Sequence, residues 1–152
     1  MMLIERHLRF PSAVLCAGPS GVFFAYGLEI EGNAEAGLAR VRAMDADGHA
    51  VVNSVLVDLN ELPHLRRICA TPNGAGVLPV GGGTSVSGYD EDGFLMMKMQ
   101  ATLGIECDSL GVLVLVPGPD IPWSLGVPPE CVNSFLSLLE DCTGRTLLAE
   151  VA

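Results

Sequence analysis

Charged side chains are scarce in this 152-residue chain, and lysine is nearly absent. Only 17% of the residues are charged, against about 25% in typical soluble domains. Lys98 is the single lysine, so the glycine-rich stretches 18–21 and 81–84 lack the lysine with which a P-loop holds phosphate. So few charges predict an apolar surface that lies against another chain.

An uninterrupted apolar run of membrane-spanning length is also missing. Residues 10–28 carry no charge, but Pro11, Pro19 and several glycines divide them into two short strands, which excludes a transmembrane helix. At the N-terminus, Glu5, Arg6 and Arg9 interrupt any signal-peptide core. We therefore expect no export signal and a cytoplasmic protein.

The five cysteines include no C-x-x-C pair and are odd in number. This pattern excludes a disulfide framework and predicts buried free thiols. Cys16 ends a predicted strand before a Gly-Pro-Ser-Gly turn, where a nucleophile would be accessible. A reactive thiolate needs a basic neighbour or a helix N-terminus, and the sequence shows neither, so we assign no catalytic residue.

Metal ligands are not evident either. The three histidines, His7, His49 and His64, are widely spaced, and none shows a recognised zinc-ligand spacing. The acidic segments 45–48 and 90–93 lack the glutamate at the twelfth position of a calcium loop. We therefore expect no metal and no cofactor, and interpret both segments as hairpin turns.

Acidic residues, by contrast, are in excess and unevenly distributed. The formal net charge is −10, of which residues 1–76 contribute −2 and residues 77–152 contribute −8. Such a field repels phosphate backbones and so argues against nucleic-acid binding. It favours a basic protein partner, although acidity that merely keeps an apolar chain soluble is the simpler interpretation.

Short apolar or alternating runs between Gly, Pro and Asp turns predict an α+β fold with a predominantly antiparallel sheet of about six to eight strands. Two helices are expected to pack on it. The first runs from an Asn60 cap to Cys69, and the second covers Pro129–Cys142. The predicted strands are Leu3–Phe10, Ala13–Ala17, Val22–Ile30, Gly37–Met44, Ala50–Val57, Phe94–Leu103, Gly111–Val116 and, more weakly, Thr146–Val151.

The chain is interpreted as one domain over residues 1–152. Both halves carry strands, an acidic turn and a final helix, which suggests an internal pseudo-repeat of about residues 1–72 and 77–152. Between them, residues 71–88 form the longest stretch that we predict to be flexible.

A rigid segment and several acids make up the predicted protein-binding surface. Residues 117–129 hold five of the ten prolines and the only tryptophan, Trp123, a residue type that often anchors interfaces. Packing of Trp123 against the last helix is the alternative. The predicted binding residues are Asp90, Glu91, Asp92, Glu106, Asp108, Asp120 and Trp123.

In size, charge and strand-rich layout, the chain resembles the small acidic immunity proteins that bacteria pair with toxins. No motif carries this resemblance, and it transfers no residue. The seven arginines to one lysine fit a GC-rich bacterial gene. We therefore predict a small acidic protein-binding module, such as an immunity, inhibitor or chaperone-like partner of a basic protein. A homo-oligomeric assembly subunit is the first alternative, and a small enzyme with an unrecognised site is the second.

Overall fold

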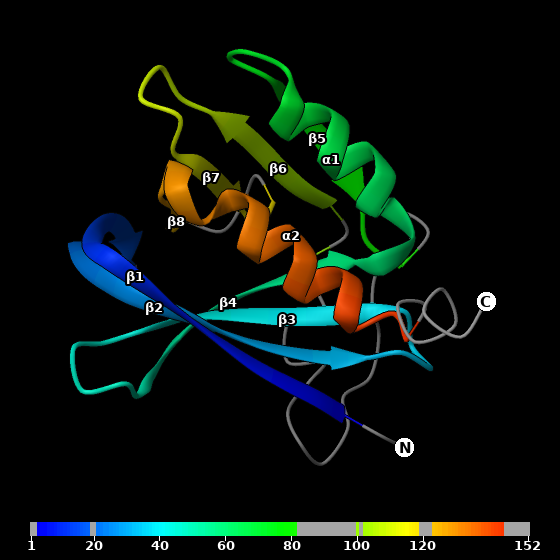
Figure 1. Cartoon of the computed structure of the whole chain (residues 1–152), viewed down its shortest axis with the longest axis horizontal. Helices are drawn as coiled ribbons and strands as arrows, with labels where there is room; N and C mark the ends of the chain where they lie inside the picture. The colour runs from blue at the N-terminus through cyan, green and yellow to red at the C-terminus, as the bar shows by residue number, and fades with distance from the viewer. Residues whose placement is uncertain (1–2, 19–20, 82–99, 101, 119–122, 145–152) are drawn as a thin grey trace.

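The computed structural model describes residues 3–18, 21–81, 100, 102–118 and 123–144, and the strands within them form two antiparallel four-stranded sheets (Figure 1). In the first sheet, neighbours follow in chain order: β1 (Leu3–Gly18), β2 (Gly21–Asn33), β3 (Leu38–Met44) and β4 (Ala50–Asp58). The second sheet has the same order of neighbours: β5 (Ala75–Pro79), β6 (Thr102–Cys107), β7 (Leu113–Val116) and β8 (Leu125–Val127). The α+β fold with predominantly antiparallel sheet is confirmed.

Each sheet is followed by a 3-10 turn that continues into a helix. Turn η1 (Leu59–Glu61) leads into α1 (Leu62–Ala70), and turn η2 (Pro129–Cys131) leads into α2 (Val132–Asp141). Prolines occupy the first turns, where a missing N–H costs no helical hydrogen bond. The same element order therefore occurs twice in the described chain, whereas the boundaries of one domain with a pseudo-repeat stay a prediction.

Each helix packs on the sheet that it does not follow in the chain, so the two helices are exchanged between the sheets. Helix α1 contacts β5 and β6, and α2 contacts β1 and β2; Figure 1 shows α2 above the first sheet. Two strand glycines permit the helices to approach the sheets closely. A Cβ atom on Gly76 would lie 2.7 Å from Cδ1 of Ile68 in α1, and one on Gly32 would lie 2.4 Å from Cβ of Cys142 after α2. Both sheets and both helices contribute to one hydrophobic core.

Two buried polar side chains hold the edge of β4. The Asp58 carboxylate accepts hydrogen bonds from the N–H of Asn60 (3.0 Å) and, beyond β5, of Gly81 (3.0 Å). The Gln100 amide pairs with the backbone of Leu56, accepting from its N–H at 3.0 Å and donating to its carbonyl at 2.9 Å. Gln100 thus bonds to Leu56 as the backbone of a neighbouring strand would, and these buried backbone groups gain partners.

The predicted Asn60 cap was wrong, since α1 has Glu61 at its N-cap without a side-chain hydrogen bond, and Asp58 caps the 3-10 turn that precedes it. Asp58 is buried at the end of β4, where its two oxygens serve the turn and the second sheet together. The prediction of flexibility was wrong for part of residues 71–88, because β5 begins at Ala75. The predicted strand at 146–151 and the turn at 90–93 lie outside the described residues.

The turn at 45–48 is confirmed as a hairpin between β3 and β4. Oδ1 of Asp45 accepts from the N–H groups of Asp47 (2.9 Å) and His49 (3.0 Å). Gly48 has φ +83°, a left-handed conformation that glycine adopts without a steric penalty. The aspartate and the glycine therefore play the roles expected from their order in the turn.

Candidate functional site

Strands β1 and β2 extend past the first sheet as a bent hairpin. The register shifts between Arg9 and Val14, where Pro11 has no N–H to donate to a partner strand. Beyond this bulge, residues 13–18 and 21–26 form what we call the hairpin arm. Figure 1 shows the arm curling toward β8.

One face of the hairpin arm packs against the second sheet. The N–H of Ser124 donates to the carbonyl of Ala17 at 3.1 Å, and the N–H of Gly126 in β8 points to Sγ of Cys16 at 3.4 Å. A Cβ on Gly126 would lie 2.8 Å from Val14. The arm thus joins the two sheets at the edge opposite Gln100.

The other face of the hairpin arm is apolar and exposed. Leu15 lies opposite Phe24 in the register, and Val22 and Tyr26 lie on the same side because strand residues two apart share a face. These four residues expose 56%, 57%, 71% and 42% of their surface, respectively. No charged residue occurs between Phe10 and Leu28. An exposed apolar cluster of this kind is typical of a protein-binding surface.

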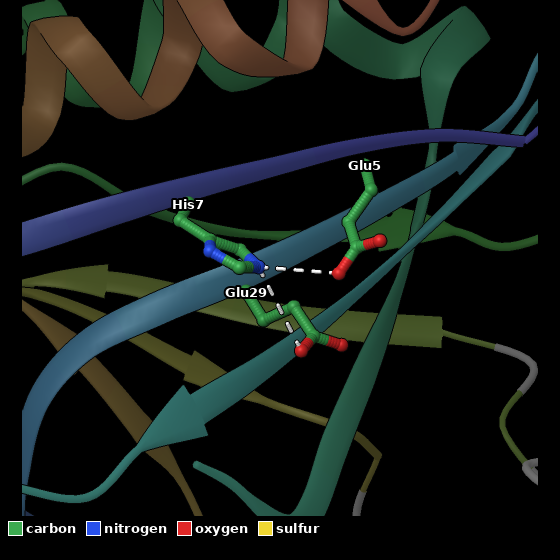
Figure 2. Close-up of side chains that lie close together, drawn as sticks. All are labelled: Glu5, His7 and Glu29. Carbon is green, nitrogen blue, oxygen red and sulfur yellow. Dashed lines mark hydrogen bonds and ion pairs between the residues drawn. The ribbon is translucent and has the colours of Figure 1, made fainter. Parts of the chain in front are cut away.

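A second cluster lies on the first sheet, on the face away from α2. Nε2 of His7 is 3.2 Å from Oε1 of Glu5 and 3.9 Å from Oε2 of Glu29. Figure 2 shows one ring nitrogen of His7, from β1, facing the carboxylates of both Glu5 and Glu29. Glu29 also forms an ion pair with Arg42 of β3 through its other oxygen. Sequence analysis missed this cluster, although the Glu-Arg-His spacing already puts Glu5 and His7 on one side of a strand.

A further group of possible metal ligands, Asp45, Asp47 and His49, lies in the β3–β4 turn. Oδ1 of Asp45 already accepts two hydrogen bonds from backbone N–H groups of this turn. This local bonding accounts for the geometry, as in other Asx turns, so the group remains a hairpin turn.

Cys16 and Cys69 lack the lowered pKa of an activated nucleophile. Burial raises the pKa of the Cys16 thiol, with the Gly126 hydrogen bond acting in the opposite direction. Cys69 and Cys107 line a hollow of about 510 Å³ between the end of α1 and the start of α2. Burial, reinforced by the neighbouring Cys107, raises the pKa of Cys69 to about 11. With their pKa values raised, Cys16 and Cys69 remain protonated at neutral pH, and protonated thiols are poor nucleophiles.

The predicted binding residues are not gathered into one patch by the described structure. Asp90, Glu91, Asp92 and Asp120 lie outside the described residues. Glu106 is exposed on β6, and Asp108 accepts hydrogen bonds from the N–H groups of Leu110 and Val112 in the β6–β7 turn. Trp123 is half-buried and packs against the core. Its neighbour Ser124 is bonded to the hairpin arm, so the end of the proline-rich segment lies beside the arm.

No family model, no curated protein and no solved structure matches this chain. Among the described residues, neither helix has the length and hydrophobicity needed to cross a bilayer.

Proposed function

We propose that the protein is a protein-binding module that docks a basic partner through the exposed face of the hairpin arm. The observation that carries this proposal is the contiguous cluster of Leu15, Val22, Phe24 and Tyr26 on an arm without charges. Two of these residues are aromatic, and buried aromatic anchors supply much of the binding energy in protein interfaces.

The shape of the hairpin arm supports the same function. The arm is held by Gly126 of β8, which contacts Cys16, and by Ser124, which donates to Ala17. The outer face is therefore presented on a supported hairpin. Burial of exposed apolar area against a partner stabilises the complex by about 25 cal/mol per Å² before the cost of association is counted. A supported surface loses less conformational entropy on binding than a flexible loop.

The net charge of −10 supports a basic partner over a second copy of the chain. Two copies repel each other at long range, whereas a basic protein is attracted and steered. Charge outside the arm thus accelerates encounter, and the arm itself supplies the apolar contact. We therefore propose that the protein acts as an immunity, inhibitor or chaperone-like partner of a basic protein, in the cytoplasm.

Substitution of Phe24 by Glu tests the proposal. Phe24→Glu places a charge in the middle of the apolar face, and we expect it to weaken partner binding by at least about tenfold, since removal of an interface anchor costs about 2 kcal/mol or more. Binding is measured by capture of the partner from source cells, followed by titration of the purified pair. Leu110→Glu is the matched control, because Leu110 is 80% exposed in a turn of the second sheet.

Equal binding by wild type and Phe24→Glu would overturn the proposal. Light scattering of the purified protein decides between the hetero-complex and the alternative. A homo-oligomer that Phe24→Glu converts to monomer would assign the arm to self-assembly instead. Circular dichroism of both variants shows that the fold is retained.

A further inference from the structure

We propose that Glu5, His7 and Glu29 bind a divalent transition-metal ion, for which Zn²⁺ is the test case. The three donor atoms of this cluster lie within 4.8 Å of one another.

The backbone brings the three side chains together. Glu5 and His7 are two residues apart on β1 and therefore share a face, and His7 is paired with Glu29 across the β1–β2 register. Leu28 and Ile30, which flank Glu29, are fully buried on the opposite face. The cluster thus stands on two paired strands, which hold ligands more firmly than a loop does.

The donor distances suit a metal of zinc size. Zinc binds imidazole nitrogen and carboxylate oxygen at about 2.1 Å, so two ligands in a tetrahedral site lie about 3.4 Å apart. Nε2 of His7 lies 3.2 Å from Glu5 and 3.9 Å from Glu29. Small rotations of side chains therefore suffice to close the site, with water in the remaining positions.

Charge and orientation favour the same ion. Arg42 holds one oxygen of Glu29 and leaves the other, Oε2, toward His7; such outer contacts orient metal ligands. Glu31, which faces Glu5 across the register, is paired with Arg40 at 2.8 Å. Two carboxylates and one guanidinium leave a net negative site, and a nitrogen ligand among oxygens favours zinc and its neighbours over calcium or magnesium.

A zinc titration of the full chain followed by two-dimensional NMR tests the proposal. We expect saturable shifts at the His7 ring and at β1–β2 amides in the wild type. His7→Ala should weaken zinc binding at least about tenfold. Removal of a group that only hydrogen-bonds to a metal ligand can already cost that much affinity. Glu5→Gln, at a largely exposed side chain, is the second variant should His7→Ala disturb the sheet.

His64→Ala is the matched control, because His64 is a partly exposed histidine whose Nδ1 lies 3.7 Å from Oε1 of Glu61. This substitution should leave zinc affinity unchanged. The proposal is overturned if His7→Ala and Glu5→Gln bind zinc as tightly as the wild type. It is equally overturned if no saturable shift occurs up to millimolar zinc, or if the shifts are confined to residues around Cys69 and Cys107.

Discussion

Thiol acidity is the residue-scale property that the fold changes most clearly. Burial raises the pKa of both Cys69 and Cys142 from the ordinary 9.0 to about 11. The unfolded chain therefore releases these protons at lower pH than the folded chain. The stability associated with the protonated thiols is fully present below pH 9 and is lost as the pH rises through 11.

We predict slow alkylation of Cys69 and Cys142 in the folded protein. Two pH units between the unperturbed and the raised pKa reduce the thiolate population at pH 8 by about 100-fold. Mass spectrometry after timed iodoacetamide treatment measures each site, and the same chain in urea is the control. Rates at these two cysteines that match the urea sample would contradict the assigned burial.

At the scale of elements, the contact between α2 and β2 depends on Gly32. Because a Cβ there would lie 2.5 Å from Sγ of Cys142, Gly32→Ala should displace the end of α2 and lower the free energy of unfolding by about 1–3 kcal/mol. Urea unfolding followed by circular dichroism measures the loss.

Gly104→Ala is the matched control for that substitution. Gly104 also lies in a strand, but its added Cβ would meet Val116 at an ordinary 3.6 Å. We expect little change in the free energy of unfolding, within about 0.5 kcal/mol. Equal losses from the two alanines would show that strand glycine itself, and not the helix contact, determines the effect.

The longer strands were predictable from the sequence because their apolar or alternating runs are long and end at clear turn residues. The predicted strands at 22–30, 37–44 and 50–57 lie at β2, β3 and β4 within a few residues. The three-residue β8 was missed, since it depends on β7 and on the hairpin arm rather than on its own pattern. The exchange of α1 and α2 between sheets depends on tertiary contacts that periodicity does not encode.

The candidate sites were predictable only in part, for similar reasons. On the hairpin arm both faces are apolar, so alternation could not show that Leu15 and Phe24 are exposed while Cys16 and Ala25 are buried. The spacing of Glu5 and His7 could have been recognised, but Glu29 joins them only through the register of β1 and β2.

At the scale of the whole molecule, the charge excess predicts salt-dependent association. Raising ionic strength from 0.01 to 0.15 M shortens the Debye length from about 30 to about 8 Å. We therefore expect the association rate with a basic partner to fall by about tenfold or more, with a smaller change in dissociation. Stopped-flow fluorescence of Trp123 or of a labelled partner measures both rates.

Charge reversal at the exposed Glu106 should slow association at low salt and have little effect at high salt. Phe24→Glu should act mainly on dissociation, because the arm supplies contact rather than steering. An association rate that does not change with salt would mean that the acidic charge plays no part in the encounter. It would contradict the proposal of a basic partner.

The exchange of helices also constrains the order of events during synthesis. The β1–β2 side of the first sheet meets its helix only after residues 132–141 have left the ribosome, because α2 and not α1 packs there. Most of the chain must therefore emerge with an apolar sheet face still open to solvent. The packing of this sheet is thus completed only after α2 has been synthesised, and until then the growing chain exposes an apolar surface of the kind that chaperones bind.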